Sequence, residues 1–91
     1  MTSWVLVVEL ASGAQPGVMK RVSGIFADRG ISLSDVLATV RQGNSFVVLG
    51  FASSQRLCDY LVRRLSRMED VQRITVHHGD DRPPWEHLPP V

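Results

Sequence analysis

Hydrophobic residues recur along the chain in two spacings, one typical of strands and one typical of helices. Two segments, 4–10 and 45–52, are almost continuously apolar, the pattern of strands buried on both faces. Elsewhere apolar residues recur every three or four positions, which predicts amphipathic helices. The predicted elements, in chain order, are a strand over 4–10, a helix from Pro16-Gly17 to Gly30, a strand over 31–41, a strand over 45–52, a helix that begins after Ser53 or Ser54, and a strand over 71–77.

Both helices carry boundary signals. Pro16 suits a first helical position, because the N–H group that proline lacks is unpaired there anyway. Gly30 stands where a helix usually ends on a left-handed residue, and a serine before the second helix can cap it. The side chains expected to be buried are Val18, Met19, Val22, Ile25 and Phe26 in the first helix and Leu57, Cys58, Leu61, Leu65 and Met68 in the second.

The strand over 31–41 contains a change of phase. Ile31 and Leu33 alternate with serines, but the next apolar residues, Val36, Ala38 and Val40, have the opposite parity. A strand that keeps one face buried can change parity only through an extra residue, so we expect a β-bulge or a late strand start near residues 34–35. The glycine at position 43 then predicts a tight turn into the next strand.

The order βαββαβ predicts an α+β fold of the ferredoxin-like type. Right-handed crossovers place the strands in a four-stranded antiparallel sheet with two helices on one face, and make the first and third strands central. Both central strands are apolar on both faces, whereas the helices can cover only one. The open face therefore needs a cover, either a second subunit in a homodimer or higher oligomer, or the C-terminal segment with Trp85 and Leu88.

The sequence divides into a folded domain over 1–78 and a Pro-rich tail over 79–91. The tail contains four of the five prolines and lacks a periodic apolar face, so we expect it to be flexible. The given sequence ends soon after the last predicted strand.

One stretch of the sequence resembles a known family. The segment PGVMKRVSGIFADRGISLSDV, which includes Gly17 and Gly30, resembles the opening of an ACT domain, a regulatory module that binds amino acids. Within that superfamily the chain is most similar to the regulatory small subunit of acetolactate synthase, or acetohydroxyacid synthase, and the resemblance extends over roughly residues 3–78. Longer members of the family carry a second domain, so the chain resembles the short form.

The resemblance implies a ligand site in the loop before the first helix, shared across a dimer interface. Family members usually hold the ligand with an Asn or Asp three positions before the glycine and with an Asn that opens the next strand. These positions are Ala14 and Ser32 here, so one side-chain partner is absent and the other is a shorter hydroxyl. The ligand-binding residues that the resemblance implies are Ala14, Gln15, Gly17, Val18, Ser32 and Leu33.

The function implied by the resemblance is regulatory and not catalytic. The chain would modulate a separate, thiamine-diphosphate-dependent catalytic subunit in branched-chain amino-acid biosynthesis, with valine, leucine or isoleucine as possible effectors. It carries no motif for a cofactor of its own. The alternative is a stand-alone ACT-domain amino-acid sensor or an interaction module with another partner.

Composition and pattern give no support for several other classes of partner and function. The formal net charge of +1 gives no reason to expect nucleic acid or membrane as partners, and no apolar run reaches membrane-spanning length. An RNA-recognition motif, which shares this element order, needs exposed aromatics on the central strands, but Phe46 and Phe51 have opposite parity. A single cysteine excludes an internal disulfide, and we expect a cytoplasmic protein.

No residue pattern indicates catalysis or a metal site. His77 and His78 are adjacent on a predicted strand, so their side chains point to opposite faces and cannot both reach one ion. Cys58 lies beside the apolar stripe of the second helix and is interpreted as a small core residue. The arginines of that helix form either a solvated face or a docking surface for an acidic partner.

Overall fold

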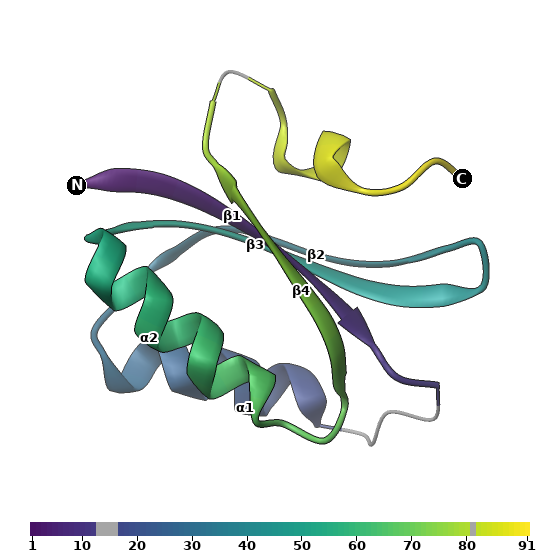
Figure 1. The fold of residues 1–91 in the computed structure, drawn as a ribbon, viewed down its shortest axis with the longest axis horizontal. Helices are drawn as coiled ribbons and strands as arrows, with labels where there is room; N and C mark the ends of the chain where they lie inside the picture. The colour runs from purple at the N-terminus through teal and green to yellow at the C-terminus, as the bar shows by residue number, and fades with distance from the viewer. Residues whose placement is uncertain (13–16, 81) are drawn as a thin grey trace.

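A computed structural model describes residues 1–12, 17–80 and 82–91 of the chain. Its elements are β1 (Thr2–Leu10), α1 (Val18–Asp28), β2 (Leu33–Arg41), β3 (Asn44–Ser53), α2 (Gln55–Ser66), β4 (Val71–His78) and a short 3-10 helix, η1 (Pro84–His87). Both long helices pack on one face of the sheet, and the C-terminal segment lies on the other side (Figure 1). The predicted βαββαβ order and ferredoxin-like architecture are confirmed.

The sheet has the strand order β2-β3-β1-β4, and every neighbouring pair is antiparallel. The two doubly apolar strands are therefore central, as predicted. The register of β2 against β3 shifts between Leu33 and Asp35, which confirms the bulge. The strand itself begins at Leu33, two residues later than the apolar pattern indicated.

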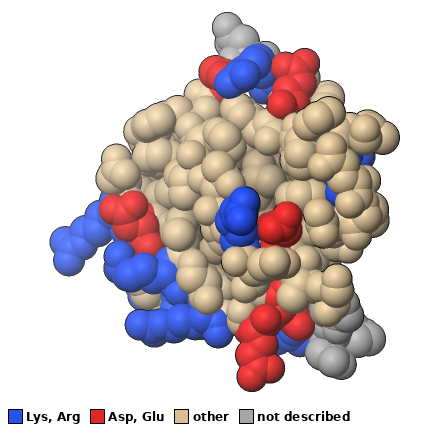
Figure 2. All heavy atoms as spheres, turned by 45° about the vertical axis from the view of Figure 1, so that its right-hand side comes forward, with Lys and Arg blue, Asp and Glu red and all other residues tan. Residues whose placement is uncertain are grey.

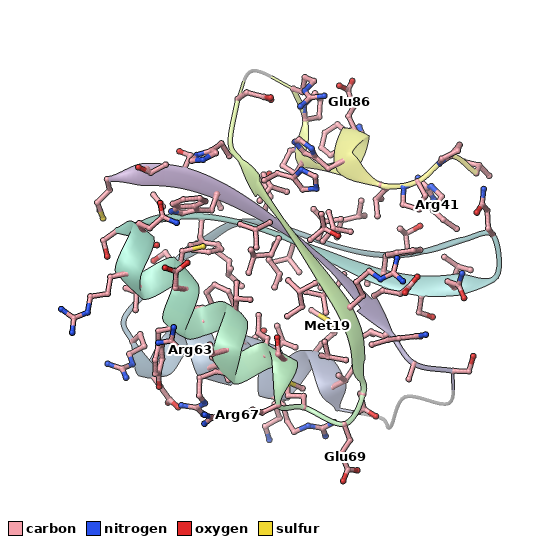
Figure 3. The ribbon with its side chains drawn as sticks, in the orientation of Figure 1. Met19, Arg41, Arg63, Arg67, Glu69 and Glu86 are labelled. Carbon is pink, nitrogen blue, oxygen red and sulfur yellow. The ribbon has the colours of Figure 1, made fainter. Side chains whose placement is uncertain are left out.

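The main core lies between the sheet and the helices. Phe26 of α1 is 1% exposed and meets Phe51 of β3 edge to face, with ring centroids 5.0 Å apart. At one end of the core the indole N–H of Trp4 donates a hydrogen bond to the Ser53 carbonyl oxygen at 3.2 Å. Met19 points from α1 toward the sheet (Figure 3), and it packs against this cluster.

Gly30 and Ser54 end and cap the helices as predicted. In contrast, α1 begins at Val18 with Gly17 as its N-cap, and Pro16, predicted as the first helical residue, lies outside the described residues. Gly17 and Gly30 flank α1 with φ values of +88° and +67°, a region that glycine occupies without strain. Ser54 caps α2, since its Oγ accepts a hydrogen bond from the Leu57 N–H at 3.2 Å. In the β2–β3 turn both Gln42 (φ 54°) and Gly43 (φ 80°) are left-handed, as a two-residue hairpin turn requires.

The open face of the sheet is covered by the chain's own C-terminal segment. Four residues of β1 and β3 form a second apolar cluster there, and Leu88 packs against it. Trp85, in contrast, remains 53% exposed. Within one chain the tail therefore covers part of this face, while a second subunit as a further cover, the division at residue 78 and the flexibility of the tail stay predictions. The members of this open-face cluster are Val5, Val7, Phe46 and Val48.

The β2–β3 hairpin extends beyond the ends of both helices (Figure 1). Val36 and Val40 belong to the helix side of the sheet, since Val36 pairs with the core residue Leu49, yet they are 49% and 59% exposed. β2 is also an edge strand. The hairpin thus presents apolar side chains beside an open row of backbone hydrogen-bonding groups, a combination that favours pairing with another strand.

Candidate functional site

The first turn of α1 presents backbone donors that have no acceptor within the helix. Gly17 is the N-cap, no side-chain hydrogen bond caps the helix within the described residues, and the first turn contains no acidic residue. The Gly17 carbonyl already accepts from the Arg21 N–H at 3.1 Å, so the helix begins at once. The first N–H groups of a helix have no intrahelical acceptor, and the helix dipole favours a carboxylate beside them by about 0.3–2 kcal/mol.

Gly17 leaves this helix end accessible. A Cβ built on Gly17 would meet no atom within 4 Å, so the described residues leave open space beside the backbone. Val18 turns its side chain into the core, where it is 9% exposed. Its N–H is one of the first-turn groups that have no acceptor within the helix. Ala14 and Gln15, two further residues of the implied site, lie outside the described residues.

The other implied residues lie at the opposite end of α1. Ser32 and Leu33 follow the turn at Gly30, where β2 begins; Ser32 is exposed and Leu33 packs partly against the core. α1 has 11 residues. A helix of that length separates its ends by about 16 Å, more than a small amino acid can bridge. One chain therefore does not bring Gly17 and Val18 together with Ser32 and Leu33.

A cavity of about 1020 Å³ lies at the Ser32 end, between that corner of the sheet and the start of the tail. Its polar lining includes the Ser34 hydroxyl, which donates to a carboxylate oxygen of Asp35 at 3.2 Å. Gly50 makes room for this pair, because a Cβ there would lie 2.8 Å from Asp35 Oδ2. Neither Asp35 nor Gly50 is among the site residues predicted from the sequence, although the change of phase near residues 34–35 marks their position.

Strand register places His77 and His78, and burial decides the role of Cys58. His77 is opposite Val5 and His78 is opposite Trp4, so the two rings lie on different faces of the sheet, as predicted. The His78 ring lies against the Trp4 ring in a tilted arrangement, with centroids 4.6 Å apart. Cys58 is 1% exposed, and burial, with a smaller effect from Asp59, raises the pKa of its thiol to about 11. Cys58 is a core residue.

The raised pKa of Cys58 makes a testable prediction about its reactivity. Only the thiolate attacks an alkylating reagent, and at pH 8 both protonation and burial keep this thiol unreactive. We expect iodoacetamide to leave the native chain unmodified by mass spectrometry, whereas the same chain in urea is alkylated once. Rapid modification of the native protein would contradict the packing of α2 described here.

The outer face of the helix layer is basic. Arg63 and Arg67 lie on the side of α2 that faces away from the sheet (Figure 3). Tyr60 lies between two more arginines: the Arg29 guanidinium is 3.9 Å from the ring centroid, and Arg64 donates to the hydroxyl at 2.7 Å. Hydrogen bonds from Arg29 and then Arg64 lower the pKa of Tyr60. Figure 2 shows a contrasting side of the molecule, toward the β2–β3 turn, where most of the surface is uncharged.

Neither α1 nor α2 is long and apolar enough to cross a bilayer, and the same holds for every helix within residues 1–12, 17–80 and 82–91.

Several solved structures share this fold. A homoserine dehydrogenase from Thiobacillus denitrificans matches with a TM-score of 0.70 and 17% identity over 88% of this chain and 18% of its own. The small subunit of acetolactate synthase from Thermotoga maritima matches with a TM-score of 0.68 and 20% identity, over 91% and 50% of the two chains. The ACT domain of a GTP pyrophosphokinase from Chlorobium tepidum has a TM-score of 0.67 and 10% identity, over 84% and 97%.

These identities establish a common fold and no more. The chain spans only 18% of the homoserine dehydrogenase and half of the acetolactate synthase small subunit. The comparison with curated protein sequences found no match. A family model, however, matches residues 9–73, more than two thirds of the sequence, and includes both ends of α1 and the bulge in β2. The chain belongs to the family of AHAS small subunit-like ACT domains.

Proposed function

We propose that the chain is a non-catalytic regulatory subunit of acetolactate synthase, which senses a branched-chain amino acid between two copies of its ACT domain. The observation that carries this proposal is the separation of the implied site into two halves. Gly17 and Val18 lie at one end of α1, and Ser32 and Leu33 lie at the other. A second copy must supply the missing half.

The free edge of β2 offers a way to join the halves. β1 and β2 are parallel to each other, because each is antiparallel to β3. Two β2 strands that pair antiparallel bring the start of one strand beside the end of the other. The end of β2 lies at the same end of the sheet as the N-terminus of α1, since α1 follows β1. Ser32 of one copy would then approach the helix N-terminus of its partner.

Regulation then follows from linkage. In this proposal catalysis resides in a separate thiamine-diphosphate-dependent subunit, and binding of the ACT dimer shifts that subunit toward its active arrangement. An amino acid that binds the interface more tightly in one arrangement than in the other shifts the equilibrium back. The basic outer face of α2, which includes Arg63 and Arg67, suits an acidic surface on the catalytic subunit.

We expect amino-acid binding to be weak, with a dissociation constant above about 1 µM, because the ligand is small and Ala14 supplies no side-chain hydrogen bond. Titration calorimetry with valine, leucine and isoleucine measures it directly. Ala14→Asn should tighten binding by restoring a polar partner. Gly17→Val should abolish it, since φ +88° disfavours a side chain and the added atoms fill the open space.

Gly24→Val is the matched control for Gly17→Val. It is the same substitution within α1, with no atom near the added Cβ and no left-handed backbone. Binding should survive there, and circular dichroism should show that both variants fold. If Gly17→Val binds as tightly as the unmodified chain, the ligand site lies elsewhere.

The partner is tested by mixing the chain with a purified acetolactate synthase catalytic subunit from the same organism. Stimulated turnover, together with co-elution in gel filtration, supports the regulatory-subunit proposal. Amino-acid binding without stimulation supports the alternative, a stand-alone ACT sensor or an interaction module with another partner.

A further inference from the structure

We infer that residues 82–91, called the strap below, form a pH-released cover over the open face of the sheet, with His77 and His87 as its latch. This inference concerns the chain by itself and does not depend on the proposed function. It starts from a ring contact: His87 of η1 stacks on His77 of β4, with centroids 4.3 Å apart and planes 27° apart. A contact of this kind holds neutral rings together and repels protonated ones.

The strap covers apolar surface. Leu88 packs against the open-face cluster, whose members Val5 and Val48 are 5% and 0% exposed. η1 positions Leu88 through short-range hydrogen bonds, from the Glu86 N–H to the Pro83 carbonyl at 3.0 Å and from the Leu88 N–H to the Trp85 carbonyl at 3.2 Å. Burial of this cluster therefore depends on the strap being in place.

Gly79 directs the chain back over the sheet. Its N–H donates to the Ser3 carbonyl oxygen at 2.8 Å, which extends the pairing of β1 and β4 by one residue. A Cβ on Gly79 would lie 2.7 Å from the Cβ of Ser3, so only glycine allows the approach. Beyond it, Arg82 pairs with Asp80 at 2.9 Å. The strap is thus attached to the sheet at its root.

The latch favours the neutral form of His77. The Nε2 atom of His87 is buried and has no hydrogen-bond partner within the described residues. Burial lowers the pKa of His77, and the positive charges of His87 and Arg82 lower it further, against an opposing effect of Asp80. Both rings also line a cavity of about 300 Å³, and Glu9 and Arg73 are two of its other lining residues.

These other charges do not replace the missing partner. Glu9 and Arg73 face each other across β1 and β4, so their charges offset one another. Glu86 lies in η1 itself, points away from the sheet (Figure 3) and acts on Arg82. No carboxylate in the described residues is hydrogen-bonded to either latch ring.

The sign of the pH effect follows from the lowered pKa. The released strap exposes His77 to water, where its pKa returns to the ordinary value of 6.5, so the open form binds more protons than the closed form. The closed strap therefore has its full stability above pH 6.5 and loses stability as the pH falls below 6.5. Release uncovers the apolar open-face cluster.

Backbone NMR relaxation tests this directly. At pH 7.5 the heteronuclear NOE values of the Glu86 and Leu88 amides should match those of β1. At pH 5.5 they should fall by at least about half, as they do for mobile segments, while the amides of α2 keep their rigid values. A hydrophobic dye should bind more strongly over the same range. An unchanged strap at pH 5.5, or a strap that is mobile at both values, would overturn the inference.

Three variants isolate the latch. His77→Phe keeps a stacking ring but removes the group whose pKa is lowered by burial, so its strap should stay ordered at both pH values. His87→Lys places a permanent charge there and should release the strap at pH 7.5. His78→Gln is the matched control, because His78 is the neighbouring residue on the opposite face, and it should behave as the unmodified chain. If His77→Phe retains the full pH response, the latch is not this ring pair.

Discussion

Replacing Val36 and Val40 together by lysine is expected to dissociate the proposed β2–β2 dimer into folded monomers. Both side chains lie on the exposed edge strand β2, at 49% and 59% exposure, and neither belongs to the main core. Lysine on an edge strand opposes strand pairing, because the charge would be buried on association. The proposed β2–β2 interface would lose its apolar contacts and gain four positive charges in the dimer.

Light scattering at about 50 µM, a concentration at which specific dimers of standard interface size are associated, measures the outcome. The unmodified chain should have twice the mass of the variant. Val76→Lys is the control: Val76 is 43% exposed on the other edge strand, β4, and faces the same side of the sheet. It should remain dimeric. A monomeric unmodified chain, or dissociation by Val76→Lys alone, would contradict pairing through β2.

Loss of the dimer should also remove amino-acid binding. In the proposed site each copy supplies only half of the contacts to a ligand. In a folded monomer Gly17 and Ser32 remain at opposite ends of α1 and do not form a complete site. The double lysine variant should therefore give no heat of binding with valine, although neither substituted residue belongs to the implied site. Binding by the monomer would show that one half suffices.

Replacing Phe26 by alanine is expected to destabilise the fold by about 3–5 kcal/mol, the usual cost of a buried phenylalanine. Phe26 is 1% exposed in the main core and loses its edge-to-face contact with Phe51. In a domain of this size the change should lower Tm by roughly 15 °C or more. Urea unfolding followed by circular dichroism, at fixed protein concentration, gives the free energy of unfolding.

Phe46→Ala is the matched comparison. Phe46 is also buried, at 7% exposure, but it belongs to the open-face cluster beneath the strap. A cavity there can be filled by movement of the strap, so the loss should be less than half of that for Phe26. Equal losses would show that the strap is as firmly packed as the helices, and would weigh against a releasable cover.

Most of the architecture was predictable because it follows from the spacing of apolar residues within each segment. Alternation and three-to-four periodicity identified every strand and both long helices, and right-handed crossovers then left one arrangement of the sheet. Even the bulge was predictable, since the parity of Val36 differs from that of Leu33. Gly30 and Ser54 behaved as expected because each acts on its own backbone or on that of a near neighbour.

The strap was not predictable in the same way. Leu88 and His87 lie in a proline-rich segment without periodicity, so nothing local indicates that they contact β1, β3 and β4. From the sequence, either a second subunit or the tail could cover the open face. Only the folded structure could show that the tail reaches this face, because the contact joins residues more than 30 positions apart.

The candidate site shows the same division between local and long-range information. The sequence by itself determined the element order, the central strands, the buried helix faces and the helix ends, because these follow from short-range periodicity and backbone preference. Only the tertiary structure decided that Val36 and Val40 stay exposed beyond the ends of the helices and that His87 stacks on His77. Those relations depend on chain reversal and packing between distant segments, which no local pattern encodes.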